Sequence, residues 1–578
     1  MKNLFGLFFV IFAVFGLVSC GGGEDTSEPE EKGIAVSLRG TNDLDIASIA
    51  EQIQAINFII EDVDGNEVKQ QSILKDNLGN QTTITGIKNV TNATLIVEAL
   101  TDTTDRNSVK WRGRATGLKF EKGKTTEVKI QLYPTASNNE SPMPKKLFVP
   151  RFGHTATLLS DGRILIAGGF TSCGSNHKCL ATNAVEIIDP ESGEVEKLAD
   201  MIEPRALHKA ALMDDGSVVF IGGVKGLNSI AQTEDEGFEN YPLLPYSFSA
   251  TSAVTKIEKY MPSYPKYNKK LNEPEISTSN TTTPVTAEIP FKAFQSILLD
   301  QPVENRINVF LVGGLDTENS EDSKGKPSNK AYTFSLANEN GTITASAVTN
   351  LADSSEPMLF PALAHGNGSI LAVGGRPGNS EYAASLISES SSENKGQGSG
   401  LNLFFTNNFA VGTYLYTFAG FNSEKGVEEV AETTEEGEGT TTEKEKAEIK
   451  YSNRILKWEV FSDSASFGQD SEGKEYQVYP GNTEVAFADT VYDEANERFI
   501  LIGGTGASNV FQVINAITLE RFQNLPSHLM KDSLVMPKAV IIPATKSPTG
   551  KTFIVITGGI NSLDGTGTAT ASIKVGNI

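Results

Sequence analysis

Short apolar runs that end in a pair of small residues recur seven times in this chain of 578 residues. Such a recurrence predicts a repeat architecture, in which each unit of about 50 residues buries its apolar face against its neighbours. Glycine in these pairs permits a close approach between backbones that a side chain would prevent. The pairs are Gly168 and Gly169, Gly222 and Gly223, Gly313 and Gly314, Gly374 and Gly375, Ala419 and Gly420, Gly503 and Gly504, and Gly558 and Gly559.

A second apolar run and a hairpin turn precede each pair. In the first two repeats, residues 150–162 and 204–216 share the pattern Arg-x-x-His and end in Asp-Gly. Asp-Gly supplies the positive φ angles that a two-residue hairpin needs. After each pair come a loop and a further β-type run, so each repeat is predicted to be a small antiparallel sheet.

This pattern resembles the Kelch repeat, in which four antiparallel strands form one blade of a β-propeller. The resemblance covers residues 145–578 and implies an all-β fold with a seven-bladed Kelch-type β-propeller. The last repeat ends soon after its third strand, Ala571–Val575. We therefore expect Lys146–Val149 to supply the missing outer strand, because a closed ring leaves no exposed sheet edge.

Residues 34–134 contain short β-type runs separated by turns, which predicts a small β-sandwich domain before the propeller. Residues 135–144 are predicted to be the linker. The expected strands are Ile34–Leu38, Ala55–Ile60, Thr82–Ile87, Thr94–Ala99, Trp111–Leu118 and Glu127–Leu132.

The first nineteen residues have a charged start and a short apolar stretch, typical of a secretory signal peptide. The following Leu17-Val-Ser-Cys20 resembles the lipobox of bacterial lipoproteins. That resemblance implies cleavage before Cys20, a lipid on its thiol, and, because Gly21 follows, anchoring in the outer membrane of the cell envelope. Residues 20–33 lack apolar side chains and are predicted to be a disordered tether. An ordinary signal peptide with a chance cysteine is the alternative.

The two remaining cysteines, Cys173 and Cys179, lie in one loop. A close pair in an exported protein predicts a disulfide. Free thiols are one alternative. A metal site is another, although His177 is the one further ligand type between them and zinc needs four ligands.

The formal net charge of −23 argues against nucleic acid as a partner, because phosphate recognition needs a basic surface. The loops that follow the glycine pairs are long, whereas the hairpins at the other end of the repeats are short. We therefore expect an unknown protein or glycan partner on the long-loop face. The acidic stretch 424–448 on that face is expected to be disordered.

Some Kelch propellers are copper oxidases, which require two Tyr and two His around the metal. His154 and His208 occupy equivalent places in two repeats, so we interpret them as structural residues. We predict no catalytic residue, no cofactor and no metal. The expected function is that of a lipid-anchored binding or scaffold protein and not an enzyme. The alternative is a propeller-based enzyme that acts on carbohydrate or another extracellular substrate.

Overall fold

The structure is a computed structural model of the whole chain. It describes residues 34–39, 51–77, 82–87, 89–105, 107–121, 124–136, 141–143, 145–171, 178–229, 246–247, 253–264, 281–285, 295–300, 303–316, 326–376, 380–397, 403–404, 406–411, 414–418, 420–433, 439–459, 476–480, 484–504, 511–520, 534–562 and 567–578. Within these residues the regular structure is almost entirely antiparallel β, which confirms the all-β prediction. No helix in the described part of the chain has the length and apolar content needed to cross a membrane.

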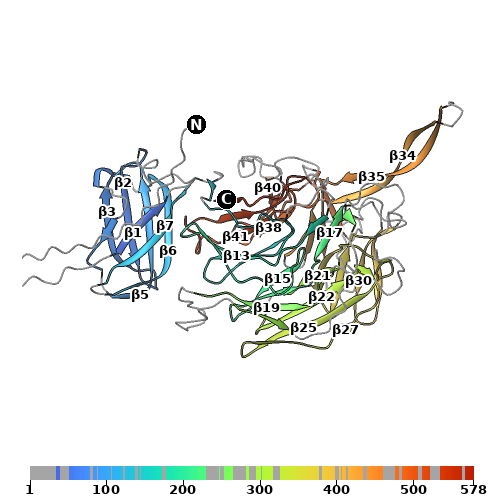
Figure 1. The fold of residues 1–578 in the computed structure, drawn as a ribbon, viewed down its shortest axis with the longest axis horizontal. Coiled ribbons are helices and arrows are strands. Elements are labelled where there is room, and N and C mark those ends of the chain that lie inside the picture. The colour runs from blue at the N-terminus through green and yellow to red at the C-terminus, as the bar shows by residue number, and fades with distance from the viewer. Residues whose placement is uncertain are drawn as a thin grey trace, which may run out of the picture.

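Two sheets at the N-terminal end enclose a common apolar core (Figure 1). The smaller sheet has the order β4 (Thr82–Ile84), β1 (Ile34–Arg39), β7 (Thr126–Gln131), with β1 and β7 parallel. The larger has the order β3 (Glu67–Leu74), β2 (Ala55–Glu61), β5 (Val90–Leu100), β6 (Val109–Phe120), β8 (Tyr133–Pro134), and a short 3-10 turn, η1 (Lys75–Asn77), follows β3. The core consists of residues from both sheets, including Val36, Phe58 and Ile130. Strand β3 was not expected, because it is largely polar and lies at the sheet edge.

Seven sheets in the rest of the described chain each contain one strand that ends at a predicted glycine pair. We call these the glycine strands: β11 (Ile164–Ala167), β16 (Val218–Ile221), β22 (Arg306–Val312), β29 (Ser369–Val373), β33 (Tyr414–Phe418), β39 (Arg498–Ile502) and β42 (Phe553–Thr557). Each pairs with the strand before it, which we call the inner strand. The inner strands are β10 (Thr155–Leu158), β15 (Lys209–Leu212), β21 (Ser296–Leu299), β28 (Ala362–Gly366), β32 (Asn407–Val411), β38 (Asp489–Asp493) and β41 (Lys538–Ile542).

On its other side each glycine strand pairs with a third strand, in the order expected for an antiparallel meander. The third strands are β13 (Val185–Asp189), β19 (Ile257–Met261), β25 (Ala331–Glu339), β30 (Tyr382–Ile387), β36 (Arg454–Glu459), β40 (Phe511–Asn515) and β43 (Ile573–Asn577). The fourth strands are β14 (Glu194–Lys197), β20 (Thr281–Val285), β26 (Thr342–Ala345), β31 (Ser392–Gln397) and β37 (Tyr476–Pro480), with β27 (Thr349–Asn350) also on β25. The sixth sheet has three strands within the described residues, and η3 (Glu494–Asn496) joins its first two.

The glycine pairs are where neighbouring sheets touch. A Cβ atom on Gly168 would lie 2.2 Å from the carbonyl oxygen of Arg205, which belongs to the next repeat. The amide of Gly169 donates to that same oxygen at 2.9 Å. Both glycines have positive φ, so a side chain here would meet a clash and backbone strain together. The glycine pair therefore lies at a junction between two sheets, where their backbones approach closely.

The same contact connects the last sheet to the first. A Cβ atom on Gly558 would lie 2.4 Å from the carbonyl oxygen of Arg151, and the amide of Gly559 donates to that oxygen at 2.8 Å. The inner strands make the same connection. Each contacts the next inner strand along the chain, and the last, β41, contacts the first, β10.

The last sheet takes its fourth strand from the other end of this region. Strand β9 (Ser141–Pro142) pairs with β43, so that Pro142 lies opposite Lys574. The sequence analysis assigns these two residues to the linker and predicts Lys146–Val149 as the strand. The predicted segment follows β9 along the chain. It also contacts the last sheet, because the Leu147 amide donates to the Ala571 carbonyl at 2.9 Å. A proline suits an edge position, because it has no amide hydrogen to leave unpaired.

The N-terminal sandwich packs on the first and last of the seven sheets (Figure 1). The Tyr133 hydroxyl donates to the Pro190 carbonyl at 2.7 Å, and the Asn577 side chain donates to the Pro134 carbonyl at 2.7 Å. Thr116 donates to the Glu191 carboxylate at 2.9 Å. The sandwich therefore covers the seam at which residues far apart in sequence meet.

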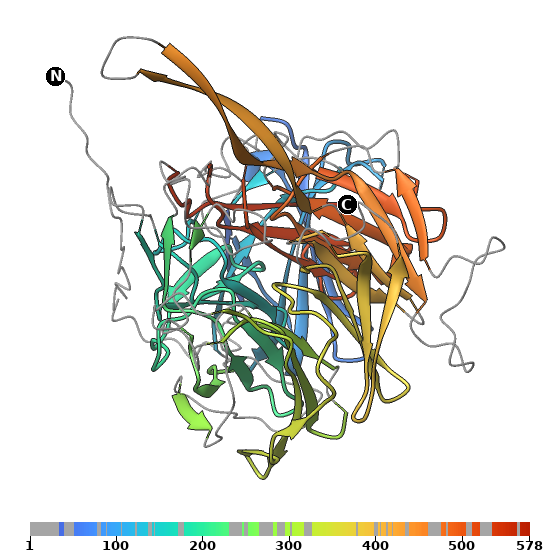
Figure 2. The same cartoon turned by 90° about the vertical axis from the view of Figure 1, so that its right-hand side faces the viewer.

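Loops that follow the glycine pairs carry additional strands. Strand β12 (Lys178–Leu180) pairs with β17 (Gly226–Ser229), which pairs with β18 (Tyr246–Ser247), and β23 (Leu315–Asp316) pairs with β24 (Lys326–Pro327). The acidic stretch forms a long hairpin of β34 (Phe421–Thr433) and β35 (Gly439–Tyr451) that projects from the body (Figures 1 and 2). The expectation of disorder there is wrong. The second strand is rich in threonine, which favours extended backbone.

Candidate functional site

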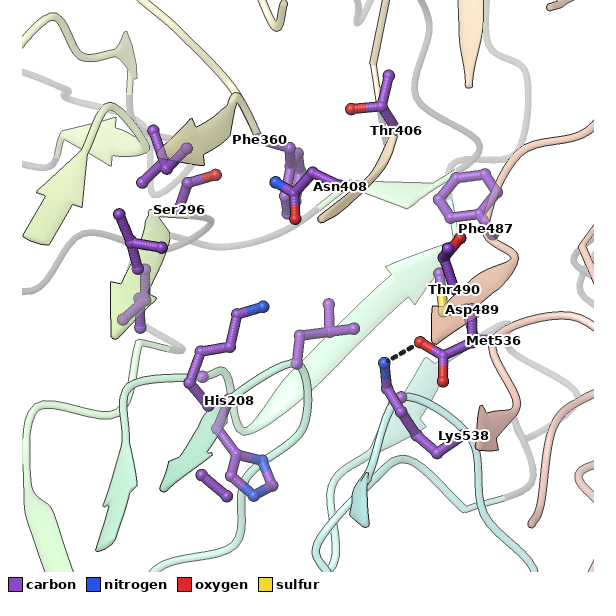
Figure 3. Close-up of a pocket in the computed structure, with 18 of the residues that line it drawn as sticks. His208, Ser296, Phe360, Thr406, Asn408, Phe487, Asp489, Thr490, Met536 and Lys538 are labelled. Atoms are coloured by element: carbon purple, nitrogen blue, oxygen red, sulfur yellow. Dashed lines mark hydrogen bonds and ion pairs between the residues drawn. The ribbon is translucent and has the colours of Figure 1, made fainter. Parts of the chain in front are cut away.

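A cavity of about 530 Å³ lies where the inner strands meet (Figure 3). Six of the seven inner strands contribute residues to its wall. Gly153 and His154, which directly precede the remaining inner strand, β10, also line it. This size lies within the range of small-molecule sites. The cavity lies at the end of the inner strands that is next to the glycine pairs, because the first residue of each inner strand pairs with the last residue of its glycine strand.

The first residue of an inner strand is polar in most repeats, and several of these residues line the cavity. They are Lys209 in β15, Ser296 in β21, Asp489 in β38 and Lys538 in β41. The Lys538 amino group donates to the Asp489 carboxylate at 2.7 Å, and the Ala539 amide donates to its other oxygen at 2.8 Å (Figure 3). The sequence analysis named none of the four as site residues.

Lys209 is the unusual member of this set. Solvent reaches its side chain within the cavity, yet protein surrounds it, and none of the described residues forms an ion pair with it. Burial lowers the pKa of Lys209 from 10.5 to about 8, the positive charge of Lys538 acts in the same direction, and Asp489 opposes both. A lysine of this kind is partly neutral near pH 8 and is then able to accept a proton.

His154 and His208 form hydrogen bonds between sheets beside the cavity. His208 Nε2 lies 3.0 Å from Thr155 Oγ1, and His154 Nε2 lies 2.9 Å from Thr557 Oγ1. Each threonine hydroxyl also donates to a backbone carbonyl, so we assign the proton of both histidines to Nε2. This geometry agrees with the structural role expected for the two histidines.

We expect these histidines to make the fold sensitive to acid. Burial lowers the pKa of His154 and of His208 well below 6.5, and the nearby arginines, Arg151 and Arg205 respectively, lower it further. Below pH 6.5 the unfolded chain takes up two protons that the folded chain does not bind, so stability falls as the pH falls. Between pH 7 and pH 5 the loss from both residues is about 4 kcal/mol.

Urea unfolding at several pH values measures this loss. Because carboxylates also titrate in acid, the control is the variant His154→Gln, His208→Gln, which retains side-chain hydrogen bonding but has no imidazole. Its stability should vary less between pH 7 and pH 5 than that of the unaltered chain. Identical pH dependence in the two proteins would contradict the assignment.

Five residues in the left-handed region of φ surround one end of the cavity. Each lies two positions before an inner strand: Gly153, Leu207, Phe360, Phe487 and Met536, with φ between 51° and 62°. We call them the collar. Backbone bonds connect them between sheets, since Leu207 donates to Gly153 at 2.8 Å and Met536 donates to Phe487 at 2.8 Å. Left-handed backbone is unfavourable for bulky residues, and residues held in it cluster at functional sites as well as in turns.

Buried ion pairs hold the segments that lead into the collar. Arg151 pairs with Glu186 and Arg205 with Glu258, and all four side chains are fully buried. Each glutamate also accepts two backbone amides, which for Glu258 are those of Ile202 and Glu203 at 2.8 and 3.0 Å. The arginines of the Arg-x-x-His pattern therefore have a structural role.

In the fourth sheet another arginine replaces the one that the pattern lacks. Arg376, directly after its glycine pair, is fully buried and donates to the Ala384 carbonyl at 2.6 Å in the third strand. In the first sheet Arg151 donates to the Ala184 carbonyl, immediately before the third strand.

The predicted glycines stand at the junctions between sheets, as described above. Of the predicted cysteine pair, Cys179 is fully buried in β12, whereas Cys173 lies outside the described residues, so the disulfide stays a prediction. Cys20 and the signal peptide also lie outside the described residues.

The cavity does not match a copper site made from two tyrosines and two histidines. Among the described residues its wall contains no tyrosine, and each of its two histidines bonds to a threonine. The described residues also contain no cluster of three or more His, Cys, Asp or Glu side chains placed to hold a metal ion. We therefore assign no step to a metal.

No family model and no curated protein sequence matches this chain. Among solved structures it is similar to a fungal alcohol oxidase of the AA5 family in complex with copper, at 13% identity and a TM-score of 0.44, covering 76% of each chain. It is also similar to YjhT, at 14% identity and a TM-score of 0.36, covering 65% of this chain and 98% of that one. At these identities the likeness to both structures concerns the fold alone.

The prediction that this chain is not an enzyme is corrected by this comparison, because one of the similar structures is itself an enzyme. The low identity transfers no activity and no residue to this chain. Any activity therefore has to be argued from the cavity and its side chains.

Proposed function

We propose that residues 141–578 form a closed seven-bladed Kelch-type propeller and that its axial cavity is the active site of an enzyme acting on carbohydrate or another extracellular small molecule. The observation that carries the enzyme proposal is Lys209, which lines the cavity together with the Lys538–Asp489 pair and has no ion-pair partner among the described residues. Lys209 accepts a proton from the substrate, and Lys538 stabilises the negative charge that develops.

Three independent contacts support closure of the ring. The amide of Gly559 donates to Arg151, strand β9 pairs with β43, and His154 bonds to Thr557. Each one joins the last sheet to the first. Seven glycine strands supply the number of blades, and closure leaves few exposed sheet edges.

Lys209→Met should abolish proton transfer while the fold is retained, because the lysine has no ion-pair partner among the described residues. Methionine also removes a charge that burial disfavours, so we expect a stability gain at neutral pH of roughly 1 kcal/mol, reduced by the solvent in the cavity. The measurement is exchange of substrate C–H protons for deuterium in D₂O, followed by NMR across a panel of extracellular sugars.

The pH profile separates a catalytic role from a structural one. The amine is active when neutral, so the exchange rate should rise as the pH increases through about 8, the pKa of Lys209. Lys197→Met, which removes an exposed lysine from β14, is the matched control and should exchange normally. Full exchange activity in Lys209→Met would refute the proposed role.

The lipid anchor remains part of the proposal, with the membrane as a partner and the outer membrane of the cell envelope as the location. Its support is the sequence Leu17-Val-Ser-Cys20 and the apolar-free tether after it. Several acyl chains give stable anchoring, whereas one does not.

Cys20→Ser should release the protein from the membrane. Cells grown with an alkyne-labelled fatty acid should tag the unaltered chain and leave the variant untagged, and the variant should move to the aqueous phase on detergent partition. Cys173→Ser is the control and should be tagged normally. A tagged, membrane-bound Cys20→Ser variant would exclude this anchor.

A second proposal is that the long-loop face binds a protein or glycan. Its support is the projecting hairpin of β34 and β35, which starts directly after Gly420 and extends beyond the body of the ring (Figure 2). Replacing this hairpin with a short turn should then abolish capture of an envelope partner without altering activity in the cavity.

A further inference from the structure

The hairpin of β34 and β35 has two sheet edges that are open to a further strand within the described chain. Its strands pair from Phe421 opposite Tyr451 to Thr433 opposite Gly439, and together they form a sheet of two strands. Among the described residues, one isolated bridge adds to this sheet, from Phe404 to Phe421 at its base. Backbone groups of a strand point alternately to its partner and away from it, so each outer edge carries a row of amides and carbonyls.

The base of the hairpin is fixed in the body of the molecule. Phe421 is 1% exposed and belongs to an apolar cluster with Phe404. Backbone bonds join these two residues in both directions, at 2.8 and 3.0 Å, and the Ser452 amide donates to the Gly420 carbonyl at 2.8 Å. Beyond this base the strands project from the body (Figure 2). The 13 residues of β34 span about 40 Å, which is long enough to pair with an extended segment of about ten residues.

An open edge of this length is a site for strand addition. A sheet of two strands is marginally stable in water, and a third strand adds a second ladder of hydrogen bonds. Natural proteins usually cover or shorten such edges, because an open edge pairs with any compatible strand. An extended peptide binds an edge through main-chain hydrogen bonds, which a sugar chain does not offer at the spacing of a strand. The edge therefore favours a protein partner over a glycan.

The charges of the two strands distinguish their edges. Strand β34 contains four glutamates and one lysine, which leaves a net charge of −3, whereas β35 contains three of each and is neutral overall. A second copy of this chain would bring the same negative charge to the edge of β34, and like charges disfavour pairing. A strand rich in lysine or arginine is attracted to that edge instead.

We propose that the outer edge of β34 binds an extended, basic segment of a partner protein, which adds to the hairpin as its third strand. This inference rests on the proposal that the long-loop face binds a partner, and it names the chemistry of that partner. Backbone pairing supplies the affinity, and the glutamates of β34 select a cationic strand. The cavity takes no part, so the inference is independent of the proposed enzyme.

The test is fluorescence anisotropy of the full chain with a labelled peptide of about ten residues in which threonine and lysine alternate. The control peptide has the same sequence with its central amides N-methylated, which keeps the charge but removes hydrogen-bond donors from both edges of the peptide. We expect the unmodified peptide to bind at least about tenfold more tightly than the control. Its amide hydrogens should also exchange more slowly when it is bound. Kanamycin, a cationic oligosaccharide, should not displace it at equal concentration.

Variants of the two edges separate a specific edge from general attraction to an acidic chain. One variant changes glutamates of β34: Glu424→Gln, Glu428→Gln and Glu432→Gln. The matched control makes the same change in β35 and alters the net charge equally: Glu443→Gln, Glu445→Gln and Glu448→Gln. At raised salt, which screens exposed charges beyond a few ångströms, the β34 variant should bind the peptide about fivefold more weakly. The β35 variant should bind it as the unaltered chain does.

Replacing residues 428–444 with Asn-Gly shortens the edge and should abolish peptide binding. Equal binding of the N-methylated peptide, or displacement by kanamycin, would mean attraction by charge alone and overturn the inference. Absence of peptide binding, together with a dimer in sedimentation that the shortened hairpin converts to a monomer, would assign the edge to a second copy. If the shortened hairpin abolished capture of an envelope partner while no peptide bound the unaltered chain, the binding face would stand and strand addition would be refuted.

Discussion

Arg205→Met should destabilise the folded chain by about 3–5 kcal/mol, the effect of leaving one charge of a buried pair without its partner. Glu258 would stay in the interior with backbone amides but no cation, because its side chain is fully buried. The Gly222 carbonyl, which accepts from Arg205 at 3.2 Å, would lose this donor next to a glycine pair. The midpoint of urea unfolding measures the effect, and it should fall clearly.

A second variant separates charge from packing. Arg205→Met together with Glu258→Gln removes the uncompensated charge but retains an oxygen for one backbone amide, so it should be more stable than Arg205→Met alone. The same pair of variants at Arg151 and Glu186 should behave alike, since that pair is equally buried. If Arg205→Met were as stable as the unaltered chain, the ion pair would have no structural role.

The sequence predicted the glycine strands well, because a short apolar run that ends in two glycines and recurs along the chain is typical of a buried strand in a repeat. It predicted a close approach between backbones at the glycines but not which residues they touch. That follows from the register, which brings Gly168 against Arg205 of the next repeat. The arginine of the Arg-x-x-His pattern and the glycine pair therefore form one junction, and a repeat alignment alone does not show which residues touch.

The site residues escaped the sequence analysis because the repeats do not share one residue type at the position that lines the cavity. The first residue of the inner strand is Lys209, Ser296, Asp489 or Lys538 in different repeats. The pattern that the repeats share therefore identifies structural residues, and the variable position beside it identifies residues that line the cavity. Aligning the repeats by the residue opposite the end of each glycine strand would have found this position.

Two predictions made from local composition are wrong, because pairing with another strand determines the backbone conformation of each segment. Residues 141–142 have a composition typical of a linker, yet the open edge of β43 pairs with them. Residues 424–448 are strongly acidic, yet their backbone pairs in one hairpin whose register places Glu428 opposite Lys444. The threonine-rich second strand favours this extended pairing.

Replacing residues 141–149 with a Gly-Ser linker of equal length should open the ring. The change removes β9 from β43 and takes away Met143 and Leu147, which are each 4% exposed in the core shared by the first and last sheets. Loss of two large buried side chains costs on the order of 5 kcal/mol. The backbone amides of residues 148 and 149, which donate to Glu186, would be held less firmly by the flexible linker.

The matched control shortens the projecting hairpin. Replacing residues 428–444 with Asn-Gly joins Val427 to Glu445, which lie opposite each other in the register, through a turn suited to a two-residue hairpin. This change removes more residues than the first but takes none from the apolar clusters of the ring. We expect its melting temperature to stay within a degree or two of that of the unaltered chain.

The comparison of the two variants tests closure itself. An open ring exposes the edge of β43 and leaves each neighbouring sheet less supported, so the first variant should melt at a much lower temperature and aggregate at its new edge. Light scattering during thermal unfolding follows both effects. Equal melting temperatures for the two variants would mean that the ring does not depend on its seam, and the closed propeller would have to be abandoned.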